Sequence, residues 1–431
     1  MSGVAGDAAV ESSSDLAMKI LVLNAGSSSQ KSCLYEFEAE ALAAPSRPLW
    51  EAEIDWTCHQ GVAELKVATA DGVALEETLR PESRSEATGR MLRTLWSGKT
   101  KIIAQPSDID VVGHRVVHGG LEFEQSTFVT AEVKTAIARL AELAPAHNPA
   151  NLEGIVAIEQ ALGAVPQVAV FDTAFHAQMP KMAAIYPGPY EWFEEDIRRY
   201  GFHGISHQYC AARAAEILDR DLDELRLVTC HLGNGCSLAA IRGGRSLNTT
   251  MGFTPLEGLM MGSRSGSIDP GLLLHLLRQP NYSVDRLDRI LNQESGLGGI
   301  SGLSSDLREI LTAMAQGNAR AQLAFDTYVH SLRCHIGAML ACLGGLDALV
   351  FTAGVGEHAA QVRGAACESF AFLGLKLDQE KNAQSRLDWD IAAPDSTVRV
   401  LVIHTEENWE IARECWKLTH EQRKENRDHG G

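Results

Sequence analysis

Residues 19–24 (KILVLN) form a short apolar run that leads directly into Ala25-Gly-Ser-Ser-Ser29, and a second extended run follows over Ser32–Phe37. Apolar runs separated by Gly and Ser are typical of two strands joined by a tight turn. Such a turn offers backbone N–H groups and hydroxyls that suit nucleotide phosphates, and Lys31 lies two residues beyond it. A plain hairpin without a ligand explains the pattern equally well.

The same pattern returns about 210 residues later. Leu227–His231 is a strand pattern, Gly233-Asn234-Gly235 a turn, and Ser237–Ile241 a second extended run. Two copies of one unit predict two domains of similar build. Strands and helices alternate along the chain, which indicates an α/β protein. Further elements are expected at residues 131–143 (helix), 167–171 (strand), 321–343 (helix), 348–352 (strand), 398–403 (strand) and 407–420 (helix).

Length and charge limit the classes of function. The chain has 431 residues, and 38 Lys plus Arg against 56 Asp plus Glu give a net charge of −18. The length predicts two domains, or three. The acidic balance argues against non-specific binding to nucleic acid or to an anionic membrane, because the overall field repels phosphate. A bound anion must therefore be held by a local cluster of donors.

Cysteine usage and hydropathy indicate a cytoplasmic protein. Nine cysteines without a C-x-x-C pair do not form a disulfide framework or a zinc ribbon. The longest apolar stretch, Ile336 to Leu346, is shorter than the ~18–20 residues that cross a bilayer. Residues 1–17 lack the features of a secretory signal and are expected to form a disordered extension.

Two arginines lie in glycine-containing segments. Arg115 belongs to VGHRVVHGG and Arg264 to MGSRSG. A guanidinium in such a context can hold a carboxylate or phosphate in bidentate fashion, although each residue could instead form a surface ion pair. The segment Gly354-Val355-Gly356 after a strand is either a nucleotide-contacting turn or a strand-to-helix turn that needs positive φ.

Histidines and carboxylates complete the candidate groups. His114/His118 and His203/His207 are spaced i, i+4, but no H-E-x-x-H motif occurs, and zinc is disfavoured. The first pair is expected to share a strand face, and His203 is either a hydrogen-bond donor or a core residue. Asp172 at a strand end and Glu407 at a helix start could hold Mg²⁺ or cap helices. The set suits phosphoryl transfer, which needs positioning and charge neutralisation more than covalent chemistry.

Ten ordered segments resemble the acetokinase family, within the superfamily of sugar kinases, heat-shock ATPases and actin. The resemblance runs from about Met18 to Cys415. It rests on LVLNAGSSSQK, VGHRVVHGG, LAPAHNPANLEGI, FDTAFH, RRYGFHGISH, HLGNGCSLAAI, TTMGFTPLEGLMMGSRSGSIDPG, LSSDLREI, FTAGVGEH and TEENWEIA.

The resemblance implies a fold and an activity. The fold is two actin-like (ribonuclease H-like) domains, each on a βββαβαβα core, with the active site in the cleft between them. The implied domains are 18–173 plus 407–431, and 174–406 with the nucleotide site and dimer interface. The implied activity is reversible, Mg²⁺-dependent (Mn²⁺ as substitute), direct in-line transfer of the ATP γ-phosphoryl to acetate in a cytoplasmic homodimer. No nucleic acid or membrane partner is expected.

The resemblance also assigns roles to residues. Arg115 and Arg264 would clamp the substrate carboxylate and the moving phosphoryl, His203 would stabilise the transition state with Arg264, and Asp172 would orient Arg115 or assist the metal. The metal would lie by Asn24 and Glu407, and His147 would be a further active-site histidine. The methyl pocket would be Val117, Phe202 and Pro255. The nucleotide site would contain Lys31, His231, Leu232, Gly233, Asn234, Gly235, Asp306, Leu307, Arg308, Gly354, Val355 and Gly356.

Four departures from the family pattern bear on these roles. Ala146 replaces Leu in the methyl pocket, Ile205 replaces Thr, Ser263 replaces Thr before Arg264, and His404 replaces Pro. The smaller Ala146 could admit propionate, because a methylene in an apolar pocket contributes about 1–3 kcal/mol, whereas Val117 should keep the pocket short. The smaller residue makes a propionate kinase the first alternative to acetate phosphorylation. A non-catalytic ATP-binding protein of the same fold and a zinc hydrolase also stay open as alternatives.

Overall fold

The computed structural model describes residues 17–26, 29–37, 45–59, 61–145, 147–384 and 386–428. The chain forms two compact units. The first comprises Met1–His114, Glu153–Val168 and Ile411–Gly431, and the second Arg115–Leu152 and Ala169–Glu410. The domain boundaries predicted from the sequence stay a prediction, as does the disorder of residues 1–17, most of which lie outside the described ranges.

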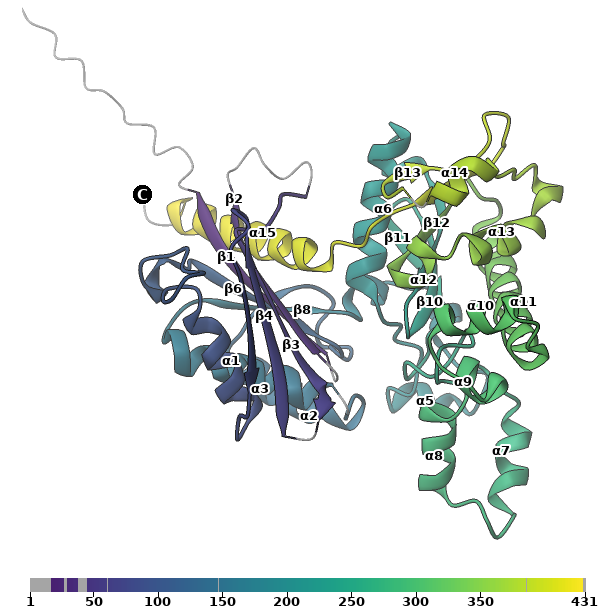
Figure 1. Cartoon of the computed structure of the whole chain (residues 1–431), viewed down its shortest axis with the longest axis horizontal. Coiled ribbons are helices and arrows are strands. Elements are labelled where there is room, and N and C mark those ends of the chain that lie inside the picture. Colours follow the sequence, from purple (N-terminus) through teal and green to yellow (C-terminus); the bar gives the residue numbers. More distant parts are fainter. Residues whose placement is uncertain are drawn as a thin grey trace, which may run out of the picture. The chain divides into compact units, whose positions relative to one another are not determined.

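The first sheet has eight strands in the order β5-β4-β3-β2-β1-β6-β8-β7 (Figure 1). The predicted hairpin is confirmed, since β1 pairs antiparallel with β2 and its other edge pairs parallel with β6. The antiparallel part is longer than the βββ expected, because β4 and β5 extend it. The bounds are β1 Met18–Ala25, β2 Ser29–Phe37, β3 Trp50–His59, β4 Val62–Thr69, β5 Ala74–Leu79, β6 Val111–Val116, β7 Thr127–Phe128 and β8 Gln167–Phe171.

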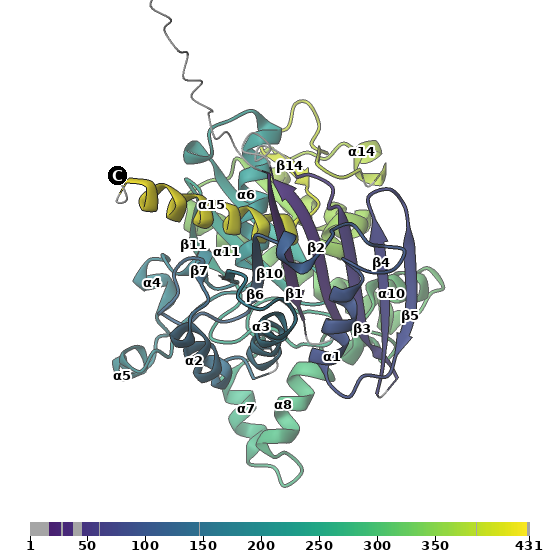
Figure 2. The same cartoon turned by 90° about the vertical axis from the view of Figure 1, so that its left-hand side faces the viewer.

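Helices α1 and α3 lie beside the strands of this sheet (Figure 2). Their apolar residues, among them Met91 and Ile158, join Leu21 and Trp50 in one buried cluster. Helix α15 packs tightly on β6, since a Cβ on Gly113 would lie 2.5 Å from Cys415 Sγ. Glycine is therefore needed at this contact. The helices of this part of the chain are α1 Arg84–Arg93, α2 Ala131–Arg139, α3 Asn148–Leu162 and α15 Glu407–Asp428.

The second sheet has six strands in the order β11-β10-β9-β12-β14-β13. The second predicted hairpin is also confirmed: β9 pairs antiparallel with β10 and parallel with β12. Strands β9, β10, β11, β12 and β14 reproduce the βββαβαβα order, with β13 added at an edge. The bounds are β9 Arg226–Leu232, β10 Cys236–Arg242, β11 Arg245–Thr249, β12 Ala348–Thr352, β13 Trp389–Asp390 and β14 Arg399–Val402.

Helices α6 and α11 cover opposite faces of this sheet (Figure 1). Cys230 and Leu238 join Tyr328 and Ile336 of α11 in the core, and the alternate strand residues face α6. The helices are α4 Lys181–Ala184, α5 Tyr190–Glu194, α6 Gly204–Leu218, α7 Pro270–Leu277, α8 Val284–Gln293, α9 Gly296–Ser301, α10 Leu307–Ala315, α11 Ala319–Leu343, α12 Ala353–His358, α13 Ala360–Glu368 and α14 Gln379–Gln384. In the described ranges, no helix combines the length and apolarity that a membrane span requires.

Three local expectations need correction. The helix expected over 131–143 ends at Arg139 and continues as a 3-10 turn over Leu140–Glu142. His118 does not share a strand with His114, because β6 ends at Val116. The positive φ expected at a glycine of 352–356 occurs instead at Ala353 (63°), directly before α12 continues through both glycines.

Candidate active site

Arg115 and Asp172 meet where two neighbouring strands of the first sheet end. Arg115 is the penultimate residue of β6, and Asp172 directly follows β8, with its N–H donating to the Val116 carbonyl at 3.0 Å. Arg115 Nε donates to Asp172 Oδ2 at 3.0 Å, and the Asp172 side chain is buried. The other oxygen, Oδ1, is buried without a hydrogen-bond partner in the described part of the chain. It remains available as an acceptor or a metal ligand.

Charges around this pair act in both directions. Burial raises the pKa of Asp172, Arg115 works against that shift, and the Glu407 carboxylate adds to it. Burial disfavours the charged guanidinium of Arg115, but Asp172 and Glu407 outweigh burial and raise its pKa. Glu407 therefore acts on the same cluster from the first residue of α15.

His203 is placed beside this pair by the start of α6. It precedes the helix with φ 57°, and the N–H of Gly204 donates to the Asp172 carbonyl at 2.9 Å. A Cβ on Gly204 would lie 2.2 Å from that oxygen, so only glycine permits this approach. The ring of His203 stacks on His231 with centroids 4.1 Å apart. Burial, followed by the charges of His231 and Arg115, holds the pKa of His203 well below 6.5, so the ring is neutral at pH 7.

Arg264 is a half-buried cation that no carboxylate neutralises within the described residues. Its guanidinium is hydrogen-bonded to the Pro255 carbonyl, which accepts from Nη1 at 3.3 Å. Burial accordingly lowers its pKa, and only Cys236 opposes the shift. A Cβ on Gly235 would lie 3.4 Å from Arg264 Nη1 and 3.7 Å from His203 Nε2. The guanidinium, the imidazole and a side-chain-free turn thus border one space, suited to an anion.

His147 belongs to the same electrostatic cluster. Burial lowers its pKa to about 4, and the charges of Arg115 and Arg264 act in the same direction. His147 is therefore neutral at pH 7 and can serve as a hydrogen-bond donor or acceptor.

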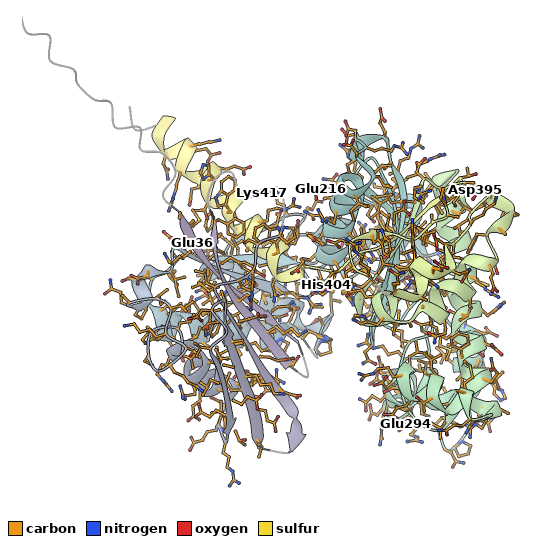
Figure 3. All side chains as sticks on the ribbon, turned by 45° about the horizontal axis from the view of Figure 1, so that its top comes forward. Glu36, Glu216, Glu294, Asp395, His404 and Lys417 are labelled. Carbon is orange, nitrogen blue, oxygen red and sulfur yellow. The ribbon has the colours of Figure 1, made fainter. Side chains whose placement is uncertain are left out.

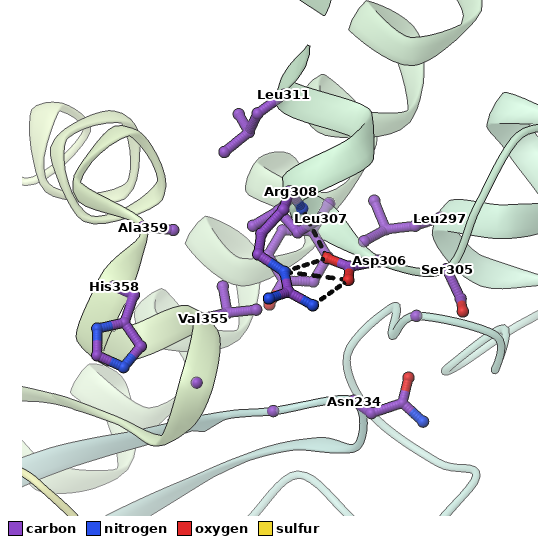
Figure 4. Close-up of a pocket in the computed structure, with 14 residues that line it drawn as sticks. Asn234, Leu297, Ser305, Asp306, Leu307, Arg308, Leu311, Val355, His358 and Ala359 are labelled. Atoms are coloured by element: carbon purple, nitrogen blue, oxygen red, sulfur yellow. Dashed lines mark hydrogen bonds and ion pairs between the residues drawn. The ribbon is translucent and has the colours of Figure 1, made fainter. Parts of the chain in front are cut away.

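A cavity of about 550 Å³ opens in the second unit next to the β9–β10 turn (Figure 4). This volume is in the range of small-molecule sites. Asp306 caps α10 by accepting from the N–H of Arg308 at 2.8 Å, and their side chains form an ion pair. The lining combines apolar and polar residues, which are Gly233, Asn234, Gly262, Leu297, Ser305, Asp306, Leu307, Arg308, Leu311, Tyr328, Gly354, Val355, His358 and Ala359.

Comparison with known proteins identifies the family. Residues 19–413 match the model of the acetokinase family. An acetate kinase of Nostoc sp. is 66% identical over 402 residues, which are 93% of this chain and 99% of that protein. The chain belongs to the acetokinase family. Two solved structures agree: an acetate kinase of Porphyromonas gingivalis (40% identity, 93% and 100% of the chains, TM-score 0.86) and a propionate kinase of Francisella tularensis (37%, 92% and 98%, 0.83).

The structure of this acetokinase brings many of the predicted nucleotide residues together. Those that line the cavity are Gly233, Asn234, Asp306, Leu307, Arg308, Gly354 and Val355. His231 and Gly235 lie instead beside His203. The side chain of Leu232 is buried in the core, and a Cβ on Gly356 would lie 3.3 Å from the Phe351 carbonyl carbon. Neither residue lines the cavity. Asn24 and Lys31 belong to the first unit, where they are cross-strand partners on β1 and β2.

Several cavity residues were missed by the sequence prediction. Three of them lie within the segments that resemble the acetokinase family, namely Gly262, Ser305 and His358. The prediction did not assign these residues to the nucleotide site. Tyr328 carries no local signal, because only the packing of α11 brings it to the cavity. The remaining missed residues are Leu297, Leu311 and Ala359.

The predicted methyl pocket and the family departures have defined surroundings. Val117 and Phe202 are buried in the same apolar cluster as Ala144. Ala146 lies outside the described residues. Ile205 is buried in α6, and Ser263 Oγ donates to the Asn292 carbonyl at 3.0 Å.

His404 replaces the family proline on the segment before α15 (Figure 3). Its Nδ1 lies 2.8 Å from Oε2 of the buried Glu357. Glu357 Oε1 also accepts from the N–H groups of Ala353 at 2.9 Å and Thr405 at 3.3 Å. His404 thus forms an ion pair with Glu357. The Glu357 carboxylate also accepts hydrogen bonds from the start of α12 and from Thr405, in the segment before Glu407.

Proposed function

We propose that this chain is an acetate kinase, which transfers the γ-phosphoryl group of ATP to acetate and forms acetyl phosphate and ADP reversibly. The observation that carries the proposal is Arg264, a half-buried cation without a carboxylate partner among the described residues, beside His203 and the bare turn at Gly235. An unneutralised guanidinium next to a neutral donor favours a phosphoryl group that gains charge on its equatorial oxygens.

The reaction needs no general base in this proposal. A carboxylate oxygen of acetate attacks the γ-phosphorus in line, the bond to the β–γ bridging oxygen breaks, and its electron pair leaves with ADP. Arg115 binds the acetate carboxylate and is oriented by Asp172. Arg264 and His203 donate to the moving group, and Val117, Phe202 and Pro255 enclose the methyl group. ATP occupies the cavity bounded by Asp306, Arg308 and Gly354, and the role of Lys31 at its phosphates stays a prediction.

The chemistry of the donors fits a magnesium ion. Mg²⁺ prefers oxygen ligands and is usually held by one or two carboxylates together with substrate phosphates. Asp172 Oδ1 is such a buried, unpartnered oxygen, and Glu407 acts electrostatically on Asp172. Glu407 is the proposed ligand, with Asp172 assisting, and the role predicted for Asn24 stays a prediction. The bound ion would neutralise the charge of the phosphates. The described residues contain no group of three or more His, Cys, Asp or Glu side chains placed to share a metal.

The test is acyl phosphate formation trapped with hydroxylamine, with ATP and Mg²⁺ and with acetate, propionate and butyrate in parallel. The expected result is a rapid signal with acetate that falls along the series. Absence of signal with every acid, despite ATP binding, would leave a non-catalytic ATP-binding protein.

A propionate kinase is the second candidate, since the solved structure of a propionate kinase matches the chain at 37% identity and TM-score 0.83. A higher kcat/KM for propionate than for acetate would establish it. We also propose a cytoplasmic homodimer, and sedimentation of the purified protein would test the dimer.

A further inference from the structure

Two polar faces meet between α6 and the second sheet. His203, Ser206 and His207 are spaced i, i+3 and i+4 at the start of α6, so they share one side of the helix. Thr229 and His231 alternate on β9 and share one face of the strand. Ser237 of β10 is the cross-strand partner of His231. Hydrogen bonds therefore connect the helix to both strands.

One continuous chain of hydrogen bonds runs from β9 to His203. Thr229 Oγ1 is 2.7 Å from His207 Nδ1, and His207 Nε2 is 2.7 Å from Ser237 Oγ. Ser237 Oγ is in turn 2.9 Å from His203 Nδ1. Thr229, His207 and Ser237 are all fully buried, at 0% exposure. Water thus does not reach the three inner members.

Hydrogens can be arranged along this chain in two ways. Both rings are neutral, because burial holds the pKa of His203 and of His207 well below 6.5, so each ring carries one N–H. In the first arrangement Thr229 donates to His207, His207 Nε2–H donates to Ser237, and Ser237 donates to His203 Nδ1. In the second, every donor and acceptor is exchanged, and His203 carries its hydrogen on Nδ1.

The hydroxyl hydrogen of Thr229 decides between them. In the described part of the chain, Thr229 Oγ1 has no hydrogen-bond partner except His207 Nδ1. The second arrangement would leave this hydrogen buried without an acceptor, and the cost of an unsatisfied buried donor disfavours it. We propose that Thr229, His207 and Ser237 are positioning residues that fix the hydrogen of His203 on Nε2.

This placement makes His203 a donor where the reaction needs one. His203 Nε2 and Arg264 Nη1 both lie next to the position that a Cβ of Gly235 would occupy. With its hydrogen on Nε2, His203 can donate to an equatorial oxygen of the phosphoryl group, whereas the other tautomer presents a lone pair to that negative charge. The catalytic consequence rests on the proposed acetate kinase activity. The position of the hydrogen on His203 does not depend on that activity.

The hydrogen position is measured by NMR on the whole protein, without nucleotide, labelled with ring-¹⁵N histidine. Long-range ¹H–¹⁵N correlations distinguish the two neutral tautomers, and His203→Gln assigns the signal among the 15 histidines. The parent is expected to show the Nε2–H tautomer alone. Ser237→Ala and Thr229→Val should show both tautomers, and Thr229→Ser should match the parent because it keeps the hydroxyl. A hydrogen on Nδ1 in the parent overturns the inference.

Kinetics give the second readout. Loss of one donor to a developing oxyanion usually lowers kcat about 10²–10³-fold. Ser237→Ala keeps part of the correct tautomer, so its kcat should fall about tenfold while the KM for ATP changes less than twofold. Thr229→Ser should retain the parent kcat. Unchanged kcat and an unchanged tautomer in Ser237→Ala overturn the inference, whereas absence of acetyl phosphate in the parent overturns the proposed function and leaves the NMR result standing.

Discussion

The two sheets share a strand order but differ in the chemistry of one face. The series β3-β2-β1-β6-β8 in the first corresponds to β11-β10-β9-β12-β14 in the second. The hairpins β1–β2 and β9–β10 can be aligned by their last cross-strand pairs, Ala25–Gln30 and Leu232–Cys236. Topology therefore positions equivalent residues in both sheets without deciding what they do.

Equivalent positions in the two hairpins carry different side chains. Counting back from the last pair, Val22 of β1 corresponds to Thr229 of β9. Asn24 and its partner Lys31 likewise correspond to His231 and Ser237. At the position of Val22 the first sheet buries an apolar side chain, whereas at the position of Thr229 the second sheet buries a hydrogen-bonded polar side chain. At this position a methyl in the first sheet is exchanged for a hydroxyl in the second, and that hydroxyl is hydrogen-bonded to His207.

The largest difference in activity between the two units should appear when one arginine is removed from each. We expect Arg264→Ala to lower kcat/KM about 10³–10⁵-fold, because an arginine that stabilises a transferring phosphoryl group contributes on that order. Arg90→Ala, in the partly exposed Arg90–Glu77 pair of the first unit, should keep the parent rate. Hydroxylamine-trapped acetyl phosphate measures both. Near-normal turnover of Arg264→Ala would exclude the proposed mechanism.

Removing one carboxylate from each unit should change stability by different amounts, because one carboxylate is buried and the other is partly exposed. Asp172→Asn leaves Arg115 without its buried carboxylate, and breaking such a pair costs about 3–5 kcal/mol. Glu77→Gln breaks a pair that solvent screens, at a cost of less than about 1 kcal/mol. Urea unfolding followed by circular dichroism measures both. Equal shifts of the two unfolding midpoints would contradict the expected role of burial.

Exchanging the two equivalent residues tests the comparison directly. Val22→Thr should lower the free energy of unfolding by about 1–3 kcal/mol, because it would place a hydroxyl without a partner at a fully buried position. Thr229→Val should also lower stability by about 1–3 kcal/mol, because it leaves Nδ1 of the buried His207 without its partner. Thermal unfolding of both proteins decides. A stable Val22→Thr would mean that the first sheet also offers an acceptor there.

Sequence reasoning predicted the two hairpins and helices α11 and α15 because each depends on local signals, but it did not predict α1, α3 or α6. An apolar run, a Gly-containing turn and a second run are recognisable within 20 residues. The added strands β4 and β5 were not anticipated, although Val62–Thr69 alternates between buried and less buried residues in the structure. The left-handed Ala353 could not be predicted either, since its conformation accompanies a hydrogen bond to Glu357 four residues later.

The candidate site was predictable by residue type more than by arrangement. The glycines around Arg115 and Arg264 pointed to anion binding before any geometry was known. The i, i+4 pair His203 and His207 suggested a metal as one alternative, whereas both rings are hydrogen-bonded to Ser237. That serine comes from a strand 30 residues away, and strand pairing determines its position. Tertiary contacts of this kind leave no local signal.

The smallest expected effect concerns the ion pair of His404 and Glu357. The hydrogen bond and charge of Glu357 raise the pKa of His404, so the pair's stabilisation is present below pH ~6.5 and is lost as pH rises through the folded-state pKa. Burial opposes the shift at Glu357, but His404 lowers its pKa on balance, so the contribution also falls in acid. His404→Gln should flatten the pH dependence of unfolding between pH 6 and 8 by less than about 1 kcal/mol, since His404 is 49% exposed.

Urea midpoints at several pH values, compared with the exposed-pair variant Lys376→Gln, measure this effect. The Lys376 variant should follow the parent curve throughout. A parent and His404→Gln with parallel curves would show that Glu357 is held by its backbone donors alone.

The buried hydrogen-bond chain also makes part of this molecule directly observable. Hydroxyl and imidazole hydrogens at a surface exchange with water too quickly to give proton signals, but those of Thr229, His207 and Ser237 are shielded from solvent. They can leave only when α6 separates locally from β9 and β10. Their resonances and exchange lifetimes would therefore report, without any attached probe, how often the second sheet opens at the base of the site and whether bound ATP slows that opening.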